Sequence, residues 1–178
     1  MMFPNILSLL RIFLIIPILW LLEQDTLIFS IIALILFVIA ALTDFLDGYI
    51  ARRTNTVSVV GALLDHVADK LLVCLILIYF LTIFNNWVYL FPILIIVSRE
   101  LAISSIRQYS AITDKTLDTS SSLLGKLKTF FHLVTIGFLI MHVVSMPIYL
   151  SISIILLWVS AIISIYTLLD YFVRWSEH

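Results

Sequence analysis

The sequence contains very little charge. It has 10 basic and 11 acidic side chains among 178 residues, so that 12% are charged while 63% are hydrophobic. Soluble globular domains have about 25% charged residues, so this composition excludes a soluble domain and indicates a polytopic membrane protein. The formal net charge of −1 says little about partners, because the positions of the charges matter more than their sum in lipid.

Cysteine and targeting signals are also scarce. The single cysteine, Cys74, lies in an apolar run; it excludes an internal disulfide and is expected to pack as a small hydrophobic residue. The first apolar run starts almost at Met1 without a basic segment or a small-residue cleavage site, so we expect a retained helix rather than a signal peptide. With no visible repeat, residues 1–178 are predicted to form a single membrane domain with no nucleic-acid partner.

Long apolar runs take up most of the chain. A membrane-spanning helix needs about 20 apolar residues. The predicted fold class is therefore all-α, with six transmembrane helices and short connections, at residues 5–22, 28–50, 59–83, 87–109, 123–143 and 148–172. An even number of spans puts both termini on the same side of the membrane.

The basic residues predict the orientation of these helices. The connections after the first, third and fifth predicted helices contain no Lys or Arg, whereas those after the second and fourth, with their flanking turns, contain most of them. Lys and Arg accumulate in cytoplasmic connections. We therefore expect the N- and C-termini and the connection between the second and third helices to be cytoplasmic.

Four carboxylates are concentrated in residues 44–69. The second predicted helix has Asp44, Asp47, Gly48 and Ala51 at positions i, i+3, i+4 and i+7. The third has Gly61, Asp65 and Asp69 at positions i, i+4 and i+8. Each set shares one helical face. Because four neighbouring carboxylates repel one another unless cations hold them, Asp44, Asp47, Asp65 and Asp69 are predicted to bind metal. A site made only of oxygen ligands favours Mg²⁺ or Mn²⁺ over zinc, and two ions are expected because paired metals suit displacement at phosphorus.

A second polar group lies on the fourth and fifth predicted helices, with Arg99, Arg107, Lys126 and Lys128. Arg99 lies about two turns deeper than Arg107, where charge is costly. This favours phosphate recognition over snorkelling for Arg99, whereas the two interpretations are balanced for Lys128. No contact is expected between Arg99 and Glu100, because adjacent residues on a helix do not face each other.

Three other polar residues have competing interpretations. His66 points to a different helical face from Asp65, so we expect it to pack between helices. His132 is expected to be a hydrogen-bonded core residue. Arg11 is equally consistent with an interfacial helix and with a headgroup-phosphate contact.

The run Asp44-x2-Asp47-Gly48-x2-Ala51-Arg52-x8-Gly61-x3-Asp65-x3-Asp69 resembles the signature of the CDP-alcohol phosphatidyltransferases at every fixed position. Shorter flanking segments resemble the bacterial phosphatidylglycerophosphate synthase branch of this family. They are Pro4–Arg11, Ser98-Arg99-Glu100 with Arg107, and Gly125–Thr129.

The resemblance implies transfer of a phosphatidyl group from CDP-diacylglycerol to sn-glycerol 3-phosphate in the bacterial inner membrane. Asp44, Asp47 and Asp65 would bind Mg²⁺ or Mn²⁺, and Asp69 would complete this set and act as the catalytic base. The CDP-diacylglycerol pocket would be shaped by Gly48, Ala51, Arg52 and Gly61. The acceptor phosphate would be held by Arg99, Arg107, Lys126 and Lys128. The family also implies a homodimer with its active site facing the cytoplasm.

Two alternatives remain open at this point. Within the family, the acceptor could be inositol phosphate, phosphatidylglycerol or serine, although the basic set disfavours serine. From another class, a transporter could use the carboxylates as an intramembrane relay. Their predicted position at helix ends and the lack of an inverted repeat count against a transporter.

Overall fold

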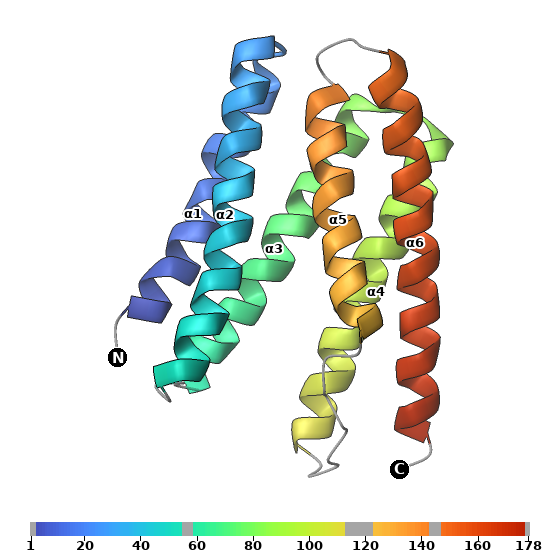
Figure 1. The fold of residues 1–178 in the computed structure, drawn as a ribbon. Helices are drawn as coiled ribbons and strands as arrows, with labels where there is room; N and C mark the ends of the chain where they lie inside the picture. Colours follow the sequence, from blue (N-terminus) through green and yellow to red (C-terminus); the bar gives the residue numbers. More distant parts are fainter. Residues whose placement is uncertain (1–2, 55–58, 113–122, 143–146, 177–178) are drawn as a thin grey trace.

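The computed structural model describes the backbone of residues 3–54, 59–112, 123–142 and 147–176, and the side chains of residues 8–43, 61, 64, 66–106, 127–141 and 148–173. Within these ranges every element is an α-helix: α1 (Phe3–Glu23), α2 (Leu27–Thr54), α3 (Val59–Ile83), α4 (Trp87–Ile112), α5 (Leu123–His142) and α6 (Pro147–Ser176) (Figure 1). The all-α prediction is confirmed. The predicted range 59–83 is the observed range of α3, and the other helices differ by about one turn or less at each end.

The helices run alternately in opposite directions between two ends of the bundle (Figure 1). We call the lower end in Figure 1 the α2–α3 end, because α2 ends there at Thr54 and α3 begins there at Val59. The first turn of α1 and the last turn of α6 lie at the same end, so both termini are on one side, as expected (Figure 1). The cytoplasmic location of this end stays a prediction.

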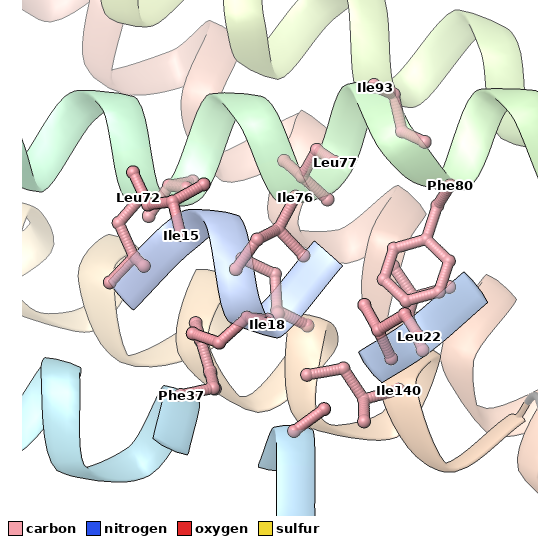
Figure 2. Close-up of a cluster of buried hydrophobic side chains, with 14 of the residues drawn as sticks. Ile15, Ile18, Leu22, Phe37, Leu72, Ile76, Leu77, Phe80, Ile93 and Ile140 are labelled. Atoms are coloured by element: carbon pink, nitrogen blue, oxygen red, sulfur yellow. The ribbon is translucent and has the colours of Figure 1, made fainter. Parts of the chain in front are cut away.

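A continuous apolar core joins the helices. α1 packs against α2 and α3, α5 packs against α2, α3 and α6, and α4 packs against α3 and α6. Figure 2 labels the core residues Ile15, Ile18 and Leu22 of α1, Phe37 of α2, Leu72, Ile76, Leu77 and Phe80 of α3, Ile93 of α4 and Ile140 of α5. Between membrane helices, close van der Waals packing of such side chains takes the place of the hydrophobic effect.

The outer faces of the helices are apolar too. Ile16 of α1, Ile155 and Ile162 of α6 and Trp87 of α4 are each more than 60% exposed, which suits contact with lipid rather than water. In the described part of the chain, three helices contain stretches long and apolar enough to cross a bilayer, namely His66–Ile83, Trp87–Ile106 and Ile148–Val173. The bundle is therefore a membrane protein by composition and length, and six spans stay a prediction.

Short turns close the opposite end of the bundle. The α1–α2 turn passes through Asp25, whose φ of 46° is in the left-handed region that Asn and Asp tolerate best among non-glycine residues. At the α3–α4 turn, Oδ1 of Asn86 accepts a hydrogen bond from the backbone N–H of Val88 at 3.1 Å, which caps the start of α4. The ring of Phe84 stacks on Tyr89 with centroids 4.3 Å apart. These turns lie where the sequence predicts them.

Candidate active site

The helix segments that carry the four predicted carboxylates both lie at the α2–α3 end. Asp44 lies ten residues before the end of α2 and Asp69 ten residues after the start of α3, while Asp47 and Asp65 lie seven and six residues from those ends. At a rise of about 1.5 Å per residue, Asp44 and Asp69 lie equally far along their helices from the α2–α3 connection, and Asp47 and Asp65 lie closer to it. Only four residues separate the two helices. The carboxylate cluster stays a prediction.

Most of the predicted metal ligands lie outside the part of the chain whose side chains are described. The side chains of Asp44, Asp47 and Asp65 lie outside the described residues, and only Asp69, which is half-buried, belongs to the described set. Within that set, no group of three His, Cys, Asp or Glu side chains could hold a metal ion. The metal site at this end stays a prediction.

The predicted CDP-diacylglycerol residues have a similar status. Gly61 lies in the first turn of α3 and is buried. Gly48, Ala51 and Arg52 lie in the last two turns of α2, and their side-chain environment lies outside the described residues. The structure thus locates these positions on the helices around the α2–α3 connection.

The best-defined polar feature is a cluster of three cations around one carboxylate, which we call the Glu100 cluster. It consists of Glu100 and Arg99 of α4, Lys70 of α3 and Lys128 of α5. The carboxylate oxygen Oε1 accepts from Arg99 and from Lys128, and Oε2 accepts from Lys70. Only 4% of the Glu100 side chain is exposed, so this buried carboxylate is offset by cations from three helices.

The expectation that Arg99 and Glu100 do not touch is wrong. Nη1 of Arg99 donates to Oε1 of Glu100 at 2.8 Å. Adjacent Cβ atoms on a helix do point in different directions, but both side chains are long enough to bend toward each other. In a buried site the attraction between opposite charges is less screened than at a surface, which favours this bend.

Arg99 is also held by the last helix. Its Nη2 donates to the hydroxyl oxygen of Thr167 on α6 at 2.7 Å. The Thr167 hydroxyl in turn donates to the carbonyls of Ile163 and Ser164 at 2.9 and 3.0 Å. The guanidinium of Arg99 is therefore fixed at two points, so the snorkelling interpretation does not describe it.

His132 lies one turn further along α5 than Lys128 and forms a hydrogen bond with the backbone carbonyl of Lys128. The carbonyl of Lys128 lies 2.6 Å from Nδ1 of His132, and a carbonyl can only accept, so Nδ1 carries the proton. Nε2 is then the acceptor for the hydroxyl of Ser164 on α6, at 3.4 Å. The prediction that His132 is a hydrogen-bonded core residue is confirmed. Lys128 is buried, which favours a site role over snorkelling.

A further contact joins α3 to α4 beside this cluster. His66 Nε2 lies 3.2 Å from the hydroxyl of Ser104, which confirms that His66 packs between helices. Together with the Lys70–Glu100 ion pair, this contact fixes the register of α3 against α4. Asp69 directly precedes Lys70, so the candidate base lies at the depth of the Glu100 cluster.

The structure brings together two of the four predicted acceptor residues, Arg99 and Lys128. The side chains of the other two, Arg107 on α4 and Lys126 on α5, lie outside the described residues. Sequence reasoning missed Lys70 and Thr167. Lys70 could have been found from its position beside Asp69, but a lone threonine on the sixth helix carried no signal.

Comparisons with known proteins give a consistent result. A family model described as CDP-alcohol phosphatidyltransferase matches residues 1–166. Several similar bacterial proteins are named CDP-diacylglycerol–glycerol-3-phosphate 3-phosphatidyltransferase. One from Rickettsia typhi is 38% identical over 171 residues, covering 95% of this chain and 94% of its own. One from Wigglesworthia glossinidia brevipalpis is 38% identical over 144 residues, covering 80% and 78%. One from Escherichia coli is 32% identical over 139 residues, covering 78% and 75%.

Proposed function

Because the chain belongs to the CDP-alcohol phosphatidyltransferase family, we propose that it transfers the phosphatidyl group of CDP-diacylglycerol to sn-glycerol 3-phosphate and releases CMP. The observation that carries the choice of acceptor is the Glu100 cluster. Three cations around one buried carboxylate suit an acceptor that bears phosphate. The names of the similar proteins agree with this acceptor.

We assign metal binding to Asp44, Asp47, Asp65 and Asp69. The donor set fits Mg²⁺ or Mn²⁺, because it offers carboxylate oxygens only, on two helix segments that share one end of the bundle. Divalent cations held there would neutralise phosphate charge and stabilise CMP as the leaving group. Around them, Gly48, Ala51, Arg52 and Gly61 would shape the nucleotide pocket, where small residues leave room for close approach to the backbone.

The reaction needs a base and a held acceptor. Asp69 takes the proton from the attacking hydroxyl of glycerol 3-phosphate, whose oxygen then bonds to the phosphorus of the phosphatidyl group as the bond to CMP breaks. Arg99 and Lys128 hold the phosphate of the acceptor, together with Arg107 and Lys126 at the same ends of their helices. Holding the two substrates together replaces a bimolecular encounter by an oriented one.

The location of the reaction follows from the helices. The acyl chains of CDP-diacylglycerol stay in the bilayer beside the apolar outer faces, while the soluble acceptor reaches the α2–α3 end from the cytoplasm of a bacterial cell. The basic connections at this end support that orientation. Two fusions after His178 test this orientation. A fluorescent protein fused there should fluoresce, and alkaline phosphatase fused there should be inactive, because both would lie in the cytoplasm.

The family also implies a homodimer. Light scattering of the purified protein in detergent tests this oligomeric state.

The deciding experiment is an assay on purified protein. CDP-diacylglycerol and Mg²⁺ are supplied with glycerol 3-phosphate, inositol phosphate, serine or phosphatidylglycerol in turn, and CMP and the lipid product are measured. We expect release with glycerol 3-phosphate. Release only with inositol phosphate, which also carries a phosphomonoester, would replace the acceptor and keep the family reaction. No release with any alcohol, from protein that remains folded, would reject the enzyme proposal and favour the transporter.

A further inference from the structure

The Glu100 cluster contains more positive charge than its carboxylate offsets. Lys70, Arg99 and Lys128 bring three positive charges, and Glu100 brings one negative charge. The ion pair of Arg99 with Glu100 is neutral by itself. A role limited to neutralising one buried arginine therefore leaves two cations unexplained.

This surplus lies where charge is costly. The side chains of Lys70, Arg99 and Lys128 are only 23%, 7% and 10% exposed. Ionised groups in membrane helices are expensive and mark functional sites, and buried charges need compensation by an opposite charge. A phosphomonoester is close to doubly negative at neutral pH, which matches the excess of two positive charges within the Glu100 cluster.

The geometry of the carboxylate explains how the cations are held. Oε1 of Glu100 accepts from Arg99 and Lys128, and Oε2 accepts from Lys70. Each lysine ammonium has three donors, and its contact with Glu100 uses one of them. Lysine stems are flexible, and three like charges repel. Without the carboxylate, the two lysines would separate toward water.

Resting on the proposed function, we propose that Glu100 is a positioning residue: it holds Lys70, Arg99 and Lys128 as a preformed receptor for the doubly charged phosphate of the acceptor. Glu100 itself does not touch the phosphate, because the two are both negative. Lys70 is thereby a further acceptor-binding residue, and its place after Asp69 joins the receptor to the helix of the base. Preorganisation lowers the entropy lost on binding, so removing Glu100 weakens acceptor binding although it removes a negative charge.

The test compares wild-type protein with Glu100→Gln, which keeps the shape of the side chain and removes its charge. We expect the KM for glycerol 3-phosphate to rise at least tenfold while the KM for CDP-diacylglycerol changes less than twofold. The inhibition constant of inorganic phosphate, competing with the acceptor, should rise in parallel. Glu100→Asp should restore part of the affinity. Equal effects on both KM values, or an unchanged acceptor KM, overturn the inference.

Glu23→Gln is the matched control, because Glu23 accepts a hydrogen bond from Tyr79 at 3.0 Å at the opposite end of the bundle. It should change neither KM. If Glu100→Gln does not fold, Lys70→Met removes one surplus cation and leaves Glu100 paired with Arg99 and Lys128. Its acceptor KM should rise at least fivefold with an unchanged Tm, and an unchanged KM overturns the inference.

Failure of the proposed function is distinguishable from failure of this inference. Binding of inorganic phosphate to the wild-type protein, followed by calorimetry in detergent, does not depend on turnover. If no alcohol supports CMP release, the proposed function fails, yet phosphate binding that disappears in Glu100→Gln still supports the preformed receptor. Phosphate binding that is equal in both proteins rejects it.

Discussion

Nη2 of Arg99 on α4 donates to the hydroxyl oxygen of Thr167 on α6 across 2.7 Å. This bond ties the sixth helix to the Glu100 cluster, although α6 contributes no charge to that cluster. The Thr167 hydroxyl is itself fixed, because it donates to backbone carbonyls of its own helix. The orientation of the guanidinium thus depends on a neutral residue 68 positions further along the chain.

Thr167→Val should weaken acceptor binding without removing any charge. Valine keeps the shape of threonine and loses the hydroxyl, and a lost hydrogen bond to a charged group costs about 1.5 kcal/mol or more. We expect a rise of roughly tenfold in the KM for glycerol 3-phosphate. Steady-state kinetics with each substrate varied in turn measures it.

Thr82→Val is the matched control for that substitution. The Thr82 hydroxyl donates to the carbonyl of Tyr79 within α3, at the exposed opposite end of the bundle. Kinetics of this variant should equal those of the wild type. A similar rise in both variants would mean that Thr167 acts through general stability.

Asp69→Asn should abolish turnover while CDP-diacylglycerol still binds. The amide keeps the size of the side chain and cannot accept the proton of the attacking hydroxyl, and loss of a general base typically costs about 10²- to 10⁴-fold in rate. CMP release and binding of the lipid substrate are measured on the same preparation. Loss of lipid binding would instead make Asp69 chiefly a metal ligand, and Asp25→Asn in the distant α1–α2 turn should leave both properties unchanged.

Removal of divalent cations should stop the reaction. Chelation with EDTA is expected to abolish CMP release, and added Mg²⁺ or Mn²⁺ should restore it, because the four carboxylates proposed as ligands favour hard cations that prefer oxygen. The measurement is CMP release against free metal concentration. Full activity in excess chelator would contradict the assignment of Asp44, Asp47 and Asp65.

Gly137→Ala should stabilise the bundle. A Cβ at Gly137 of α5 would lie 3.7 Å from Cδ1 of Leu34 on α2, an ordinary van der Waals contact. Alanine is preferred over glycine within a helix by about 1 kcal/mol, which corresponds to a rise of about 2–4 °C in Tm for a chain of this size. Thermal unfolding in detergent checks it, and the converse change Ala33→Gly on α2 should lower Tm. A fall in Tm for Gly137→Ala would show that close approach of α2 and α5 matters there.

The helices could be predicted from sequence because their lengths follow from apolar runs interrupted by short polar turns. The predicted range 59–83 coincides with α3 because Asn85 and Asn86 leave little choice about where the run ends. The equal distances of Asp44 and Asp69 from the α2–α3 connection also follow from helix bounds alone. These features are local, so periodicity and length are sufficient to locate them.

The Glu100 cluster could not be predicted in the same way. Its members come from three helices, and their register depends on packing that no local pattern encodes. The rule that adjacent helical residues do not meet holds for short side chains and fails for Arg99 and Glu100, whose stems are long. Thr167 had no distinguishing neighbour in sequence, because its role depends entirely on where α6 packs.

The pairing of Arg99 with its own neighbour also bears on how the protein is made. α4 carries an arginine and a carboxylate that bond to each other at 2.8 Å, so the helix contains its own counter-ion. When α4 leaves the ribosome, Lys128 is still inside the exit tunnel, and an isolated arginine would resist partitioning into lipid. The internal pair leaves the apolar stretch Trp87–Ile106 of α4 without net charge as it enters the bilayer, and the two lysines join Glu100 only once the helices assemble.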